Sequence, residues 1–137
     1  MTLHPQVLAG LLDAEVEAAR SALGPRAADL RHDGTALLMS LRRPDGTWLL
    51  RLEGTNYDAE PFDVGLIDDQ GVLLPVEAWI PGFGLGIHPV LEVPWVCVSG
   101  TRGYYSHPSH YTERWDAVRY ELRADTLLAK LLEKAGL

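Results

Sequence analysis

The chain contains a single cysteine, Cys97, in a part of the sequence that also holds three histidines. His88 stands nine residues before the cysteine in a His-Pro pair, and His107 and His110 follow it. Thiols and imidazoles do nucleophilic, acid–base or metal chemistry near neutral pH. Three interpretations of Cys97 are therefore open: a nucleophile, a metal ligand, or a small core residue.

As a nucleophile, Cys97 would attack a carbonyl and hold the acyl group as a thioester, because a thiolate both attacks well and leaves well. Arg102 or a histidine near the sulfur would favour the thiolate. The backbone N–H groups of the 99–100 turn are candidate donors to the oxyanion. His107 or His110 is the candidate base that deprotonates an incoming amine or hydroxyl.

The metal interpretation uses one thiolate and three imidazoles, a ligand set that Zn²⁺ accepts: His88, Cys97, His107 and His110. His107 and His110 are three residues apart, which is close enough to share an ion, and Glu113 is a possible substitute ligand. The spacing matches no standard zinc motif.

The third interpretation places Cys97 in the core. Free cysteine is among the most buried residue types, and its neighbours Trp95, Val96 and Val98 are apolar. In that case the chain would be a binding module without catalysis.

Composition narrows the classes of function. The chain has 137 residues, which suits one domain over 1–137, and it is 47% apolar and 23% charged, as in ordinary globular proteins. With 12 Lys and Arg against 19 Asp and Glu, the net charge is −7. This balance argues against binding to nucleic acid, which relies on clustered Lys and Arg.

The same sequence gives expectations about location. No apolar run reaches the roughly 20 residues needed to span a bilayer. The N-terminus has no basic start and carries Asp13, Glu15 and Glu17, so it is not typical of an export signal. One cysteine allows no internal disulfide. We therefore expect a cytoplasmic protein whose partners are proteins or small molecules, with no membrane partner.

Periodicity predicts the elements that must position these side chains. Apolar residues at helical spacing predict a helix over 3–23, which Gly24-Pro25 ends. Residues 35–42 and 47–54 are strand-like runs around Arg-Pro-Asp-Gly, the pattern of a β-hairpin. Residues 61–68 and 72–80 are the third and fourth strand candidates, with Pro75 indicating an edge or a bulge in the latter.

The remaining chain is a long loop and a second helix. Glycines and prolines interrupt the pattern from 81 to about 111, and the aromatic residues there predict a packed rather than a disordered loop. Leucines recur on one helical face of 125–137. The predicted class is α+β: an N-terminal helix, a four-stranded antiparallel meander, a long ordered loop with the cysteine, and a C-terminal helix.

This order, together with certain motifs, resembles the ubiquitin-conjugating enzyme fold, and in particular its divergent bacterial members. Residues 54–62 are similar to the family's turn between the second and third strands. Ile87-His88-Pro89 resembles the His-Pro motif that precedes the catalytic cysteine, and Cys97 occupies the position of that cysteine. Trp115 falls where the family has a tryptophan. The resemblance covers about residues 5–135.

The resemblance implies that Cys97 carries a ubiquitin-like modifier as a thioester, received from a ubiquitin-activating-enzyme-like protein, and that no cofactor is required. It implies that His88 organises the loop, and that the acidic residues of the first helix contact the activating enzyme. A binding module of this fold would hold a ubiquitin-like partner. Two features depart from the family: Val90 replaces the asparagine that follows His-Pro, and the segment after the cysteine is rich in Tyr and His. The acceptor group is therefore left open.

Overall fold

The first helix follows directly from the sequence. The computed structural model describes residues 3–137, and in it α1 spans Pro5–Leu23. The ring of His4 caps the helix by accepting the N–H of Gln6, and Pro5 fits the first turn, where no N–H partner is needed. Gly24, with φ of +58°, ends the helix. Residues 1 and 2 of the predicted domain lie outside the described residues.

Four antiparallel strands form one sheet in the order β1-β2-β3-β4, as the α+β prediction required: β1 Arg31–Asp33, β2 Ala36–Arg43, β3 Gly46–Glu53 and β4 Asp63–Ile67. The hairpin predicted around Pro44-Asp45 joins β2 to β3. Because side chains alternate across a strand, the register Leu37↔Leu52 and Met39↔Leu50 places these four apolar residues on one face.

The predicted fourth strand over 72–80 is wrong. That segment holds a short 3₁₀ helix at Val76–Ala78 and pairs with the sheet only through a bridge between Leu73 and Ile67. Pro75 has no N–H to donate to a ladder. The strand that sequence analysis missed is β1, which pairs with β2 through its backbone and has the polar sequence Arg-His-Asp, so no apolar alternation marks it.

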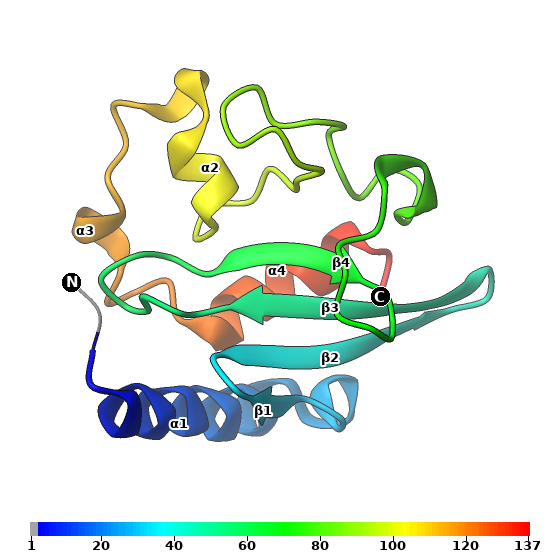
Figure 1. The fold of residues 1–137 in the computed structure, drawn as a ribbon. Helices are drawn as coiled ribbons and strands as arrows, with labels where there is room; N and C mark the ends of the chain where they lie inside the picture. Colours follow the sequence, from blue (N-terminus) through cyan, green and yellow to red (C-terminus); the bar gives the residue numbers. More distant parts are fainter. Residues whose placement is uncertain (1–2) are drawn as a thin grey trace.

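The chain after β4 is irregular for most of its length and then becomes helical. Beyond the 3₁₀ helix at Val76–Ala78, its helical elements are α2 Arg102–Ser106, a 3₁₀ turn at Pro108–His110, α3 Trp115–Val118 and α4 Ala124–Lys134. Helix α4 is the predicted C-terminal helix. In Figure 1 the segments from β4 to α3 lie along the β4 edge of the sheet, on the opposite side from α1.

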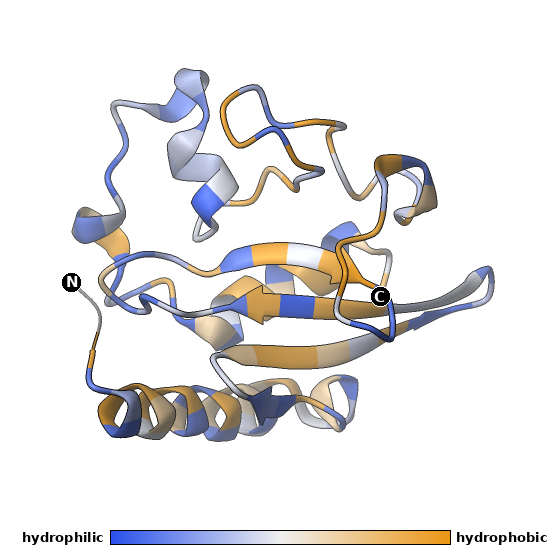
Figure 2. Cartoon of the chain, viewed as in Figure 1, coloured by the Kyte–Doolittle hydropathy of each residue, from blue (hydrophilic) through white to orange (hydrophobic). Residues whose placement is uncertain are grey.

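The core lies where α1 and α4 pack on the sheet. Leu12 and Ala19 of α1, and Leu128 and Leu131 of α4, are fully buried together with the inward residues of β2 and β3. Figure 2 shows apolar residues along the central strands, and again in parts of the loop segments beyond β4. Among residues 3–137, no helix has the length and apolar character that crossing a membrane requires.

A buried charged cluster joins α1 to the chain entering α4. The carboxylate of Glu15 accepts a hydrogen bond from the hydroxyl of Tyr57 at 2.5 Å and lies 3.1 Å from Nε of Arg123. Arg123 also contacts Asp58 at 2.8 Å. Burial, and then the bond to Glu15, raises the pKa of Tyr57 far above its ordinary value. Glu15 is therefore a structural residue and not part of an exposed docking surface for a partner.

Replacing Glu15 by Ala should lower the free energy of unfolding by about 2–4 kcal/mol. The Tyr57 hydroxyl loses its acceptor, and Arg123 loses one of its two carboxylate partners at a site that is mostly shielded from water. Urea denaturation measures the change. Glu17→Ala is the matched control, since Glu17 is exposed on the same helix; its effect should stay within about 0.5 kcal/mol. Equal effects of the two substitutions would contradict the structural role of Glu15.

Candidate active site

The segment before the cysteine folds back on itself. The N–H of Leu85 donates to the carbonyl of Trp95 at 3.0 Å, and the N–H of Trp95 donates to the carbonyl of Gly86 at 3.3 Å. The N–H of His88 donates to the carbonyl of Val93 at 2.8 Å. Residues 85–95 thus form a hairpin-like loop whose end leads directly into Cys97.

The ring of His88 is the internal support of this loop. Nδ1 accepts the N–H groups of both Val90 and Leu91 at 3.0 Å. Nε2 therefore carries the hydrogen and donates it to the carbonyl of Gly103 at 2.9 Å. The side chain is fully buried with its edge on Trp95. Since both ring nitrogens are bonded to backbone, His88 connects the loop to α2 and has no nitrogen left for a metal or a substrate.

His107 packs against both Trp95 and His88. The rings of His107 and Trp95 stack, with centroids 5.1 Å apart and an angle of 14°. Nδ1 of His107 accepts the N–H of Ser109 at 3.1 Å and lies 2.7 Å from its hydroxyl oxygen, so the ring caps the turn at Pro108–His110. This turn sets the direction in which His110 points.

His110 is the histidine that contacts the cysteine. Its Nε2 lies 3.8 Å from Sγ of Cys97, and its Nδ1 lies 2.8 Å from Oε2 of Glu113. Cys97 is half-buried, the His110 side chain is 22% exposed and that of Glu113 is 49% exposed. A thiol, an imidazole and a carboxylate are therefore aligned in the order used by cysteine nucleophiles, at a sulfur–nitrogen distance typical of a site without substrate. We call Cys97, His110 and Glu113 the relay.

Tyr104 of α2 fixes the relay from two directions. Its ring stacks on that of His110, with centroids 3.8 Å apart and an angle of 15°, and its hydroxyl donates to Oε1 of Glu113 at 2.8 Å. The bond to Glu113 raises the pKa of Tyr104 to about 12. The same bond, followed by the contact with His110, lowers the pKa of Glu113. The carboxylate is thus charged at neutral pH and oriented toward the imidazole.

Two groups expected to act on the sulfur have other partners. Arg102, a candidate for favouring the thiolate, pairs with Asp63 at 3.4 Å. The N–H of Gly100, a candidate oxyanion donor, donates to the hydroxyl oxygen of Tyr105 at 3.2 Å. Of the 99–100 turn, only the N–H of Ser99 has no acceptor among the described residues.

Open space adjoins the relay. A pocket of about 530 Å³ has Tyr104 and Glu113 in its wall. Its other lining residues come from the chain after Cys97, α2, the chain before α3, α3 and the segment after it: Ser99, Tyr105, Thr112, Arg114, Ala117, Val118 and Leu122. A small molecule or the end of a peptide placed there would meet the carboxylate side of the relay.

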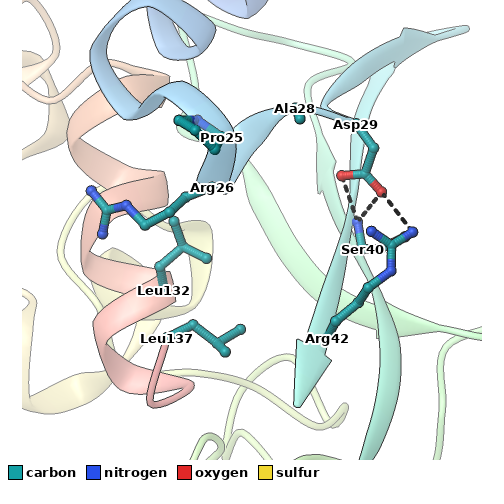
Figure 3. Close-up of a pocket in the computed structure, with 8 residues that line it drawn as sticks. All are labelled: Pro25, Arg26, Ala28, Asp29, Ser40, Arg42, Leu132 and Leu137. Atoms are coloured by element: carbon teal, nitrogen blue, oxygen red, sulfur yellow. Dashed lines mark hydrogen bonds and ion pairs between the residues drawn. The ribbon is translucent and has the colours of Figure 1, made fainter.

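A second pocket, of about 340 Å³, lies elsewhere, between the chain after α1, β2 and the end of α4. Its central polar group, Asp29, already accepts the N–H of Ser40 and pairs with Arg42 at 3.8 Å (Figure 3). It shares no lining residue with the relay. The carboxylate of Asp29 is thus already paired within the pocket wall.

The four residues of the metal interpretation are not gathered around one point. Within residues 3–137 there is no group of three or more His, Cys, Asp or Glu side chains placed to hold an ion. Of the set, only His110 turns a ring nitrogen toward the sulfur of Cys97. Both nitrogens of His88 bond to backbone, and Nδ1 of His107 accepts the N–H of Ser109.

Comparison with known proteins gives no relative. Neither the protein-family models nor the curated protein sequences include a match to this chain.

Two residues of the site were not assigned their roles from the sequence. The sequence suggests Glu113 only as a substitute metal ligand, although it stands three residues after His110, a spacing that brings side chains together on a helical turn. For Tyr104 the sequence predicts only packing of the loop. No spacing rule joins it to His110, because the irregular chain between α2 and the turn decides that contact.

Replacing Tyr104 by Phe should raise the pKa of Glu113 toward its ordinary value near 4.3, because the variant keeps the ring on His110 but removes the largest cause of the lowered pKa. In the native protein, Glu113 is fully ionised and holds His110 at any pH above the ordinary pKa range of a glutamate. The contact is lost when the carboxylate takes up a proton, as the pH falls through the lowered pKa of Glu113. Carboxyl-carbon NMR during an acid titration measures the midpoint.

Tyr120→Phe serves as the matched control, since Tyr120 is 72% exposed and bonds only to Arg119. The control should titrate as the native protein does. A Glu113 midpoint that is the same in both variants would mean that the Tyr104 hydroxyl does not hold this carboxylate.

Proposed function

We propose that Cys97 is the nucleophile of an acyl-transfer site that carries a ubiquitin-like modifier as a thioester in a bacterial conjugation pathway. The observation that supports the chemistry is the relay: Nε2 of His110 faces Sγ at 3.8 Å and is backed by Glu113 at 2.8 Å. The identity of the acyl group, and of the activating-enzyme-like partner that supplies it, rests on the resemblance of the sequence to ubiquitin-conjugating enzymes.

The loading step needs only groups that the site holds. His110 takes the thiol proton, and the Cys97 thiolate attacks the carbonyl of the thioester on the activating partner. The new carbon–sulfur bond forms as the old one breaks, and the partner's thiol leaves with a proton. Because one thioester replaces another, the step is nearly balanced in energy and runs in both directions. Glu113 stabilises the imidazolium that forms transiently.

The position of the sulfur favours this function over the two alternatives. A binding module predicts a sulfur enclosed in the core. Cys97 is only half-buried, although its neighbours Val96 and Val98 are buried. In the zinc interpretation His88 is one of four candidate ligands, and both of its ring nitrogens are bonded to the backbone of the loop and of α2. The same bonds place the end of the His-Pro loop beside the cysteine, which is the organising role that the resemblance implies for His88.

Incubation with a synthetic peptide thioester that ends in Gly-Gly tests the proposal. We expect intact-protein mass spectrometry to show the gain of one acyl group, removable by hydroxylamine, and no gain in Cys97→Ala. The native protein should load at least about tenfold faster than the protein in guanidinium, because a positioned base contributes about 10²–10⁴-fold. Equal native and unfolded rates, or no loading, would contradict the proposal.

A further inference from the structure

Loading of Cys97 would change the group that Nε2 of His110 faces. In the free site, Nε2 of His110 faces a thiol; in the thioester, that sulfur has no proton to give. The ring does not turn away, because Glu113 holds its Nδ1 at 2.8 Å and Tyr104 covers its face at 3.8 Å. A fixed, unoccupied acceptor nitrogen is thus left beside the thioester carbonyl.

Solvent borders the relay. The His110 side chain is 22% exposed and that of Glu113 is 49% exposed, so the imidazole lies at the boundary between protein and solvent. The pocket of about 530 Å³ begins at Tyr104 and Glu113. A water molecule between Nε2 and the carbonyl carbon would have its proton acceptor already in place, with no conformational change required.

From this geometry we infer that the protein has a hydrolytic activity toward acyl thioesters, in which His110 is the general base and Tyr104 and Glu113 are positioning residues. The inference rests on the proposed function, since it begins from the acyl group on Cys97. Water attacks the thioester carbonyl and gives its proton to Nε2 of His110. The tetrahedral intermediate collapses with cleavage of the carbon–sulfur bond. The Cys97 thiolate takes the proton back, and a carboxylic acid is released.

The departures from the conjugating-enzyme pattern support the same activity. Val90 offers no side-chain amide at the place where those enzymes have an asparagine, so the donor associated with attack by lysine is absent. The residues after the cysteine supply a base with a carboxylate behind it instead. A base so placed can accept a proton from water as well as from a hydroxyl or an amine. Of these acceptors, water is the one that is always present.

A single-turnover experiment tests the inference. The protein is loaded with the Gly-Gly peptide thioester, freed of donor on a desalting column, and followed at pH 7 by intact mass as the acyl group is lost. The key variant is His110→Asn, in which the amide can still bond to Glu113 but cannot act as a base. If this variant loads poorly, it is loaded at pH 9, where thiolate forms without a base, and then returned to pH 7.

We expect the acyl group to persist at least about tenfold longer in His110→Asn than in the native protein, given that a positioned base contributes about 10²–10⁴-fold. Glu113→Gln and Tyr104→Phe should give intermediate lifetimes. The matched control is His4→Asn, which removes an exposed histidine while keeping a residue that caps α1 well. It should decay as the native protein does.

The outcomes separate the two proposals. Failure of the native protein to load overturns both of them. Normal loading, followed by equal decay in the native protein and in His110→Asn, overturns the hydrolytic activity and leaves the thioester carrier in place. A longer lifetime in His110→Asn alone, with the peptide acid as the released product, supports hydrolysis by the relay.

Discussion

The bonds of the His88 ring are the constraint on which the site depends. A buried imidazole must satisfy two nitrogens, and here three backbone groups do so, two from the following residues and one from Gly103. A side chain at Gly103 would meet Trp95 at 2.9 Å, so glycine allows α2 to approach the ring. Because the loop before the cysteine and the helix after it are both fixed to one ring, Cys97 is held between them.

Contacts with the loop after β3 hold the other part of the site, the chain around α3, in place. The loop after β3 stacks Tyr57 on Phe62 and bonds to Glu15 and Arg123, while the indole of Trp115 donates to the carbonyl of Asp58. The chain around α3 is therefore fixed to the sheet by the same cluster that joins α1 to α4. Glu113 lies just before α3, so this anchoring sets the distance between the carboxylate and His110.

Much of the fold could be predicted from the sequence, and the parts that could not are those made by backbone or by irregular chain. The regular spacing of apolar residues predicted α1, α4 and the β2–β3 hairpin, because each of these elements has a face that must be buried. It gave no sign of β1, whose polar residues pair through their backbone, and it misassigned 72–80, where Pro75 removes a donor. The histidines were candidates only because imidazoles can act as bases or ligands. Which of them contacts the sulfur depends on the 3₁₀ turn at Pro108–His110, and no repeating sequence pattern indicates that turn.

In the proposed mechanism, the stacking of Tyr104 on His110 is what would let one relay serve both halves of acyl transfer. An imidazole free to rotate would lose its alignment when the thiol proton leaves, and each later step would have to restore it. Here the ring face is covered and Nδ1 is bonded, so only Nε2 can change its partner. In the proposed mechanism, the chemistry would then be decided by what occupies the space beside Nε2: a thiol before loading, and an acceptor afterwards. Selectivity among acceptors would come from the surface around that space, because the relay supplies a base but no contact that recognises one acceptor.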